Sequence, residues 1–260
     1  MITSLTLLIL SLVALYIGAG WLVQGSSALA LKAKISPLVV GLTIVAFGTS
    51  APELVVSLNA TLSGQGDIAI GNIVGSNIFN IGVILGVSAT ICPLQVKKQL
   101  LRIDIPVMLA ATVLFTILFW NGTLGRTEGL FFLTGIIIYT IFSLFYSRKH
   151  GTEGSSQELE EQPKHWAVDT LAIVGGLVVL VFASRLLVDN AVSIAKELGV
   201  SEAVIGLTIV AAGTSMPELA TSIVAAYKRK TDIAIGNIVG SNLFNILTIA
   251  GSCALIHPIE

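Results

Sequence analysis

Two long segments of this sequence occur twice, at one constant separation. The first, GLTIVAFGTSAPEL at Gly41–Leu54, returns as GLTIVAAGTSMPEL at Gly206–Leu219 with two of fourteen positions changed. The second, DIAIGNIVGSNIFNI at Asp67–Ile81, returns as DIAIGNIVGSNLFNI at Asp232–Ile246 with one of fifteen changed. Both pairs are 165 residues apart. Segments that keep one offset without insertion or deletion indicate an internal duplication, so both halves of the chain are expected to build the same unit.

The composition predicts an integral membrane protein. Hydrophobic residues make up 54% of the chain and charged residues 11%, and the mean hydropathy is +0.92. This is too little polar surface to cover a soluble globule of 260 residues. The net charge of −1 gives no indication of a nucleic-acid partner. Cys92 and Cys253 form no CxxC pattern, so neither a disulfide nor a thiolate metal site is expected, and no cofactor is indicated.

Eight apolar segments are long enough to span a membrane. A hydrocarbon core of about 30 Å requires about 20 apolar helical residues. By this measure the predicted spans are 3–24, 36–61, 68–92, 101–120, 128–146, 167–188, 202–226 and 233–256. A polar linker at 147–166 separates a first repeat with five spans, 1–146, from a second repeat with three, 167–260. We therefore expect an all-α membrane protein of five plus three helices.

The basic residues between the spans predict the orientation, since Lys and Arg favour the cytoplasmic side. Eleven lie on one side: Lys32, Lys34, Lys97, Lys98, Arg102, Arg148, Lys149, Lys164, Lys228, Arg229 and Lys230. Three lie on the other: Arg126, Arg185 and Lys196. The N-terminus is thus expected outside and the linker in the cytoplasm. With five spans per unit the two copies are expected to be inverted, which is the architecture of many secondary transporters.

Each repeat carries one glutamate, Glu53 or Glu218, within apolar sequence. A carboxylate at the centre of a bilayer costs about 2.5 to 3.5 kcal/mol on insertion scales, and such residues are functional by default. The structural alternative is that both are protonated or hydrogen-bonded merely to hold the bundle together. A helix-breaking proline and a Thr-Ser pair beside each glutamate favour the functional interpretation.

The residues around Glu53 favour cation binding. On a helix, Thr49 and Ser50 lie on the same face as Glu53. Pro52 has no amide hydrogen, so the Gly48 carbonyl loses its helical partner and the helix bends there. Hydroxyls, carbonyls and carboxylates are together the hard oxygen ligands that calcium selects and sodium accepts. The second copy repeats this arrangement with Gly213, Thr214, Ser215, Pro217 and Glu218.

The second repeated segment adds neutral oxygens at four-residue spacing. These belong to Ser76 and Asn80, and to their counterparts Ser241 and Asn245. Three GxxxG steps allow close approach of neighbouring helices. They pair Gly71 with Gly75, Gly82 with Gly86, and Gly236 with Gly240. The four remaining asparagines, Asn72, Asn77, Asn237 and Asn242, are interpreted as structural bonds between helices.

At these residues the sequence resembles the cation/calcium exchanger superfamily, specifically its prokaryotic sodium–calcium exchanger branch. GTSAPEL and GTSMPEL resemble the paired alpha-repeat motifs of that family, whereas its proton-coupled branch more typically carries a GNAxE form. The resemblance implies an inverted-repeat transporter fold, with Glu53 and Glu218 as shared calcium ligands. It also implies that the calcium and sodium sites are completed by Thr49, Thr214, Ser50, Ser215, Ser76, Ser241, the carbonyls of Ala46 and Ala211, and Asn80 and Asn245 at the central position.

The family has ten spanning helices, whereas the second repeat here stops after three. Its missing fourth and fifth helices carry no motif in the first repeat, so the ion site is expected to be complete, but one flank of the bundle would be uncovered. The chain is then either a shortened gene product or one whose flank is covered by a partner or a second copy.

The predicted function is secondary antiport of sodium against calcium across a cell membrane, with both ions and the lipid bilayer as the expected partners. The absence of a Gly-rich phosphate-binding loop favours ion gradients, rather than ATP, as the energy source. The alternatives are a proton-coupled calcium antiporter, a passive cation channel and an intramembrane acid hydrolase. The hydrolase is disfavoured because the stripe of neutral hydroxyls suits ion ligation better than acid–base catalysis.

Overall fold

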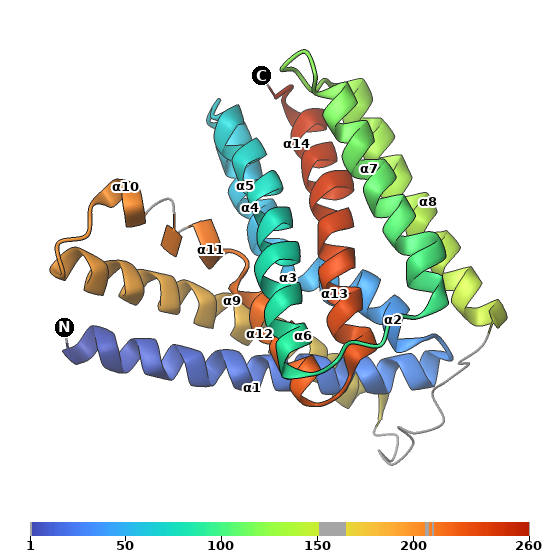
Figure 1. Cartoon of the computed structure of the whole chain (residues 1–260), viewed down its shortest axis with the longest axis horizontal. Coiled ribbons are helices and arrows are strands. Elements are labelled where there is room, and N and C mark those ends of the chain that lie inside the picture. The colour runs from blue at the N-terminus through green and yellow to red at the C-terminus, as the bar shows by residue number, and fades with distance from the viewer. Residues whose placement is uncertain (1, 151–164, 206–207, 210, 260) are drawn as a thin grey trace.

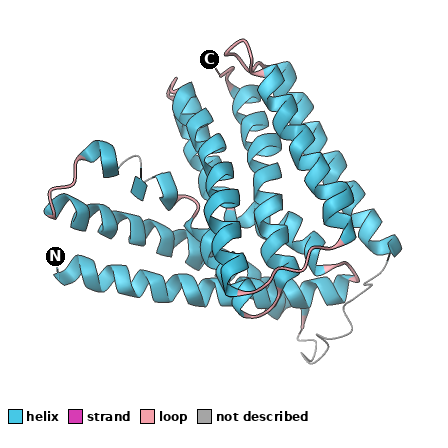
Figure 2. Cartoon of the chain, viewed as in Figure 1, coloured by secondary structure: helices cyan, strands magenta, loops and turns pink. Residues whose placement is uncertain are grey.

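The computed structural model describes residues 2–150, 165–205, 208–209 and 211–259, and it is built of helices (Figures 1 and 2). Elements labelled η are π-helical turns. In chain order the first repeat contains α1 (Ile2–Ala33), α2 (Pro37–Val40), η1 (Gly41–Val45), α3 (Ala46–Thr49), α4 (Ala51–Leu62), α5 (Gly66–Phe79), η2 (Asn80–Leu85), α6 (Gly86–Ile91), η3 (Leu100–Asp104), α7 (Ile105–Leu118) and α8 (Arg126–His150). The second contains α9 (Trp166–Glu197), α10 (Glu202–Ile205), α11 (Ala211–Gly213), α12 (Met216–Tyr227), α13 (Thr231–Phe244), η5 (Asn245–Ala250) and α14 (Gly251–Ile256).

Six helices in the described part of the chain are long and apolar enough to cross a membrane, and a bent pair, Pro37–Thr49 with Ala51–Leu62, makes a seventh. The predicted count of eight is therefore not confirmed. The predicted span at 202–226 includes residues outside those that the structure describes, and only its second part, α12, is a continuous helix of 12 residues. Most of the predicted linker, at 151–164, also lies outside the described residues.

The two longest helices, α1 and α9, lie side by side and cross the remaining bundle at a steep angle (Figure 1). Glycines allow their backbones to touch. A Cβ atom on Gly176 would lie 2.7 Å from the Gly18 carbonyl oxygen, and one on Gly25 would lie 2.8 Å from that of Asp169. A buried ion pair between Lys32 and Asp169 joins the same two helices. Asp169 is thus part of the packing between the first helices of the two repeats.

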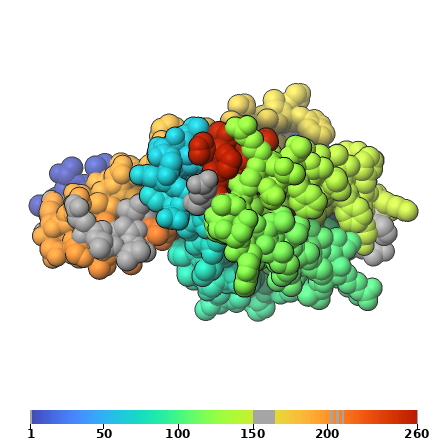
Figure 3. Space-filling view, turned by 90° about the horizontal axis from the view of Figure 1, so that it is seen from above, coloured from blue at the N-terminus to red at the C-terminus, as the bar shows by residue number. Residues whose placement is uncertain are grey.

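The centre of the molecule is the segment α13–η5–α14, which η1, α7 and α8 surround. In Figure 3 its C-terminal end, in red, lies between the ends of α4 and α5, in cyan, and those of α7 and α8, in green. Within its most apolar 18 residues, 94% are buried. Its repeat counterpart, Gly66–Ile91, is 28% buried over the same length. The difference arises because α7 and α8 cover the second-repeat helix, while no described helix pair covers the corresponding face in the first.

The close helix packing predicted from the GxxxG steps is confirmed in the second repeat and not in the first. A Cβ atom on Gly236 would lie 2.6 Å from the Leu38 carbonyl oxygen, and one on Gly240 would lie 2.6 Å from that of Leu42. The four glycines of the other two predicted steps, Gly71, Gly75, Gly82 and Gly86, have no described neighbour within 4 Å of an added Cβ. The expectation of close helix approach was therefore wrong for the first repeat of this chain.

The repeat supplies a matched pair of variants to test this packing. Gly240→Ala should destabilise the protein by about 1–3 kcal/mol, because its Cβ would overlap the Leu42 backbone. Gly75→Ala, at the equivalent position, should leave stability unchanged or raise it slightly. Thermal unfolding of the purified variants in detergent is the measurement. Equal losses of stability in both would contradict the described asymmetry.

Candidate cation-binding site

The helix that carries Glu53 is interrupted beside the carboxylate. Helix α3 ends at Thr49 and α4 begins at Ala51, with a bend of 47° between the two parts. Pro52 stands in the first turn of α4, where its missing amide hydrogen costs no helical bond. Glu53 lies in the same turn, so the partial positive charge of the helix N-terminus faces its carboxylate. The proline predicted this break, but not that it places the glutamate at a helix N-terminus.

The second repeat contains the same break. Ser50 has φ −83° and ψ 7° where the first helix stops, and Ser215 has φ −86° and ψ 9° at the equivalent point. Glu218 lies in the first turn of α12, again directly after a proline. Both glutamate side chains are 1% exposed. Two helix N-termini therefore present carboxylates within the protein interior.

The second repeated segment contains a π-helical turn in each of its two copies. Turn η2 begins at Asn80 and turn η5 begins at Asn245, and both side chains are 1% exposed. A π-helical turn inside an α-helix is frequent at functional sites, since it shifts the phase of the side chains on either side. The hydrophobic spacing of these segments gave no sign of the turns.

Hydrogen bonds connect the repeats to each other reciprocally. The Ser50 hydroxyl donates to Oε1 of Glu218 over 2.8 Å, and the Ser215 hydroxyl donates to Oε1 of Glu53 over 2.9 Å. Each serine thus stabilises the glutamate of the opposite repeat. The two repeats form one site together, and neither builds it alone.

Of the eleven buried side-chain oxygens without a hydrogen-bond partner among the described residues, six follow the same symmetry. Among the described residues, buried Oε2 atoms of both Glu53 and Glu218 have no hydrogen-bond partner. The same holds for the Oγ atoms of Ser76 and Ser241 and for the Oδ1 atoms of Asn80 and Asn245. An orphaned buried polar atom is costly, so three such pairs at equivalent repeat positions call for an explanation other than packing.

The residues that the sequence predicted as ligands are mostly brought into the interior. Ten of the twelve are buried, namely Ala46, Thr49, Ser50, Glu53, Ser76, Asn80, Ser215, Glu218, Ser241 and Asn245. Thr214 is half-buried and Ala211 is exposed. The Ala46 carbonyl accepts hydrogen bonds from the Ser50 amide at 3.0 Å and the Thr49 hydroxyl at 3.4 Å. Ala211 and Thr214 are therefore less enclosed than Ala46 and Thr49, their counterparts in the first repeat.

Asn72 and Asn237, interpreted from sequence as structural, hold the site in place. Asn72 donates to the Glu53 carbonyl at 3.1 Å and to the Ser57 hydroxyl at 2.9 Å. Asn237 makes the equivalent contacts in the second repeat and accepts the Thr49 hydroxyl at 3.0 Å. Their fixed distance of 19 residues from the two glutamates was visible in the sequence.

Asn77 and Asn242 each accept a hydrogen bond from the asparagine side chain at the central position of the opposite repeat. Asn80 donates to the side-chain oxygen of Asn242 at 3.1 Å, and Asn245 donates to that of Asn77 at 3.0 Å. Both bonds use the amide nitrogen, so the Oδ1 atoms of Asn80 and Asn245 are left as acceptors. The structural role predicted for Asn77 and Asn242 agrees with these contacts.

This arrangement has the chemistry of a site for a hard cation. It gathers carboxylate, amide and hydroxyl oxygens, which are ligands that calcium prefers and that sodium shares. No group of three or more His, Cys, Asp or Glu occurs in the described residues, so the formal ligand charge comes from two carboxylates. Two carboxylates balance one divalent cation.

A protein family and several known proteins are similar to this chain in sequence. The family described as sodium/calcium exchanger protein matches residues 3–145 and 168–260. The inner membrane protein YrbG of Escherichia coli is 39% identical over 100% of this chain and 82% of its own length. The sodium/calcium exchanger MaX1 of Methanosarcina acetivorans is 32% identical over 98% of this chain and 83% of its own. The Ca(2+)/H(+) antiporter ChaA of Bacillus subtilis is 28% identical over 90% and 73%, respectively.

Solved structures agree as well. A structure of the sodium-calcium exchanger NCX_Mj, soaked with Na+ and without Ca2+, superposes with a TM-score of 0.86 at 32% sequence identity. The match covers 100% of this chain and 84% of that one. The all-helical fold is therefore shared over the whole length of the sequence.

Reciprocal bonding predicts equal effects of removing either carboxylate charge. Glu53→Gln and Glu218→Gln should each slow calcium uptake into proteoliposomes by roughly 10- to 100-fold, because a hydrogen-bonded charge is replaced by a neutral amide of similar shape. Glu128→Gln is the matched control, since its carboxylate accepts a hydrogen bond from the Gly125 amide in a turn outside the site. Uptake at the unchanged rate in either buried variant would exclude that carboxylate as a ligand.

Proposed function

This chain belongs to the sodium/calcium exchanger protein family, and we propose that it is a secondary antiporter that moves sodium and calcium in opposite directions across a cell membrane. It is a multi-pass membrane transporter rather than an enzyme. The observation that carries the proposal is the set of three symmetric pairs of buried oxygens without a partner. Cations bound among these residues would supply the partners that the six atoms lack.

In the proposed site, Glu53 and Glu218 bind calcium and share in binding sodium. The reciprocal serine bonds would hold one oxygen of each carboxylate in place and leave the other for the ion. The remaining proposed ligands are Thr49, Thr214, Ser50, Ser215, Ser76, Ser241, Asn80, Asn245 and the carbonyls of Ala46 and Ala211. Thr214 already contacts this set of residues, because its hydroxyl donates to Oδ1 of Asn72 at 3.4 Å. Ala211, which is exposed, would join the ligands only after it becomes buried as Ala46 is.

Alternating access follows from the proposed inverted repeat. In Figure 1 the equivalent segments α5–α6 and α13–α14 run in opposite directions, which supports inversion. The open packing of the second-repeat break and the closed packing of the first would then exchange when the site turns to the other side. The proposed topology has eight membrane-spanning segments, five in the first repeat and three in the second.

The coupling ion is proposed to be sodium. The GTSxPE form of both motifs favours it, while the similarity to a protein named Ca(2+)/H(+) antiporter keeps proton coupling as the alternative. With two carboxylates, one calcium makes the site neutral, whereas three sodium ions would make it positive. The sodium-loaded form would then sense the membrane potential by about 2.3 kcal/mol per charge per 100 mV.

Calcium uptake by the purified protein in vesicles tests both coupling and charge. An outward sodium gradient should drive uptake, a proton gradient should not, and potassium should have no effect. Uptake should also change with the clamped membrane potential. Uptake driven by protons supports the alternative, uptake without any gradient indicates a channel, and sodium-driven uptake that ignores voltage contradicts the proposed charge.

The N-terminus is proposed to lie outside and the linker in the cytoplasm, as the basic residues predict. Single cysteines placed near Ser155 and near Asn121, in a Cys92→Ser, Cys253→Ser background, provide the test. A membrane-impermeant thiol reagent applied to intact cells should label the second position only. Labelling near Ser155 from outside would reverse the orientation.

We propose that another membrane segment, or a second copy of the chain, covers the outer face of α5–η2–α6. The large exposed apolar side chains of this segment are Ile68, Val74, Ile78, Ile81, Val83, Val87 and Ile91. The chain on its own should self-associate or be poorly stable in detergent, since a covering segment would shield this surface. A monodisperse, thermally robust monomer with full exchange activity would show that no cover is needed.

A further inference from the structure

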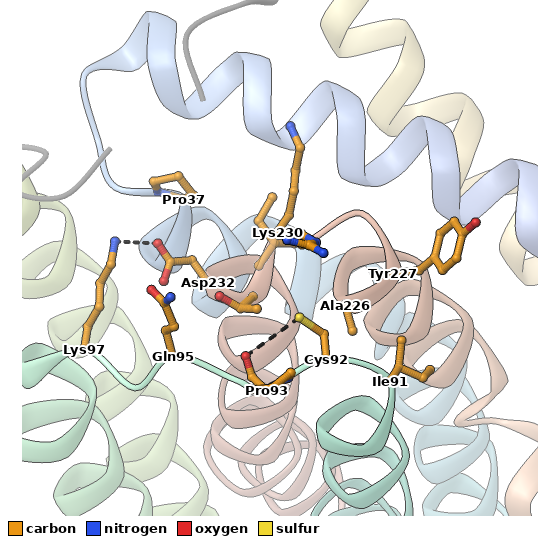
Figure 4. Close-up of a pocket in the computed structure, with 13 residues that line it drawn as sticks. Pro37, Ile91, Cys92, Pro93, Gln95, Lys97, Ala226, Tyr227, Lys230 and Asp232 are labelled. Atoms are coloured by element: carbon orange, nitrogen blue, oxygen red, sulfur yellow. Dashed lines mark hydrogen bonds and ion pairs between the residues drawn. The ribbon is translucent and has the colours of Figure 1, made fainter. Parts of the chain in front are cut away.

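A cavity of about 780 Å³ opens where the loop after α6 passes the turn between α12 and α13 (Figure 4). Three basic residues line it: Lys97, Arg229 and Lys230. One acidic residue, Asp232, also lines it and is paired with Lys97. Apolar side chains, among them Ile91 and Tyr227, line it as well. The cavity therefore combines a net positive lining with an apolar border.

Two of these cations have no ionic partner. Neither Arg229 nor Lys230 forms an ion pair with a residue that the structure describes. In Figure 4 the Lys230 side chain extends away from the Lys97–Asp232 pair. Their neighbour Lys228 differs, because its ammonium group donates to the Gly20 carbonyl on α1 and does not line the cavity. Two basic side chains without an ionic partner among the described residues thus line the same cavity.

The backbone at Arg229 shows that a basic side chain occupies a position suited to glycine. Arg229 has φ +57° at the end of α12, where its amide bonds the Ala226 carbonyl and the next amide bonds that of Ala225. The equivalent residue of the first repeat, Gly64, ends α4 with the same pair of bonds at φ +72°. This left-handed turn favours glycine at the end of a helix, so the arginine occupies it against a backbone preference.

A second pair of turns repeats this difference. Lys34 ends α1 with φ +55°, and its repeat counterpart Gly199 ends α9 with φ +79°. Under the proposed orientation both glycines lie on the outer side and both basic residues on the cytoplasmic side. Lys34 lies three residues before Pro37, and Pro37 lines the cavity. The strained basic turns and the cavity thus belong to the same side of the molecule.

We propose that this cavity binds the phosphate group of an anionic phospholipid at the cytoplasmic surface of the membrane, with Arg229 and Lys230 as its cationic ligands. Basic pockets between membrane helices suit such head groups, and the apolar border would contact the start of the acyl chains. Arginine matches phosphate geometry with paired donors, which gives a reason for its presence in a turn that favours glycine. The site rests on the proposed orientation but is independent of ion coupling.

Lipid-dependent thermal stabilisation of the purified protein tests the proposal without any transport measurement. Mixed micelles containing phosphatidylglycerol should raise the midpoint of unfolding, whereas phosphatidylcholine should not. Arg229→Gly and Lys230→Gln should each raise the lipid concentration for half-maximal stabilisation by about fivefold. Lys228→Gln, which removes the same charge from the adjacent position, should change it less than twofold.

Arg229→Gly also separates ligand loss from misfolding. Because glycine suits the turn, this variant should be as stable as the parent protein, or more stable, in neutral detergent. Equal weakening by Lys228→Gln would show diffuse attraction to the surface and overturn a defined site. Stabilisation by inorganic phosphate at the same phosphate concentration would assign the cavity to a soluble anion, and no response to either source would exclude phosphate binding.

Discussion

Two carboxylates in the interior of a membrane protein need protein partners, because lipid offers no hydrogen bonds to replace those of water. In this chain each glutamate receives a serine hydroxyl from the opposite repeat, through Ser50 to Glu218 and Ser215 to Glu53. The helix breaks at the two prolines make this exchange possible, since they place each glutamate at a helix N-terminus facing the other half. Duplication is therefore a requirement of the site, and one repeat alone would leave its carboxylate without its serine.

The motif segments of the two repeats are nearly identical in sequence, but different helices pack against them. Helices α7 and α8 enclose α13–η5–α14, and the glycines of that segment touch the backbone around Leu38 and Leu42. The face of α5–η2–α6 has no such cover, and its glycines face open space among the described residues. Thr214 and Ala211 are correspondingly less buried than Thr49 and Ala46. The two repeats thus differ both in the cover of their second motif segment and in the burial of the residues at their helix break.

Much of this could be predicted from the sequence, because a repeat, a proline and a charge in apolar sequence are local signals. The break before Glu53 and the burial of Ser76, Asn80, Ser241 and Asn245 followed from such signals. The π-helical turns, the reciprocal serine bonds and the positioning contacts of Asn72 and Asn237 did not, since each depends on which helix lies opposite. The glycine steps failed for the same reason: identical GxxxG sequences pack tightly only where a partner helix is present.

The central claim is that the two glutamates and the paired oxygens around them form one site that calcium and sodium occupy in turn. Equilibrium calcium binding to the purified chain, titrated in the presence of increasing sodium, tests it most directly. The account predicts one calcium ion per chain, displaced by sodium with a cooperative dependence, because more than one sodium ion must enter to replace one calcium. Calcium binding that sodium leaves unchanged, or a chain that binds no calcium, would contradict it.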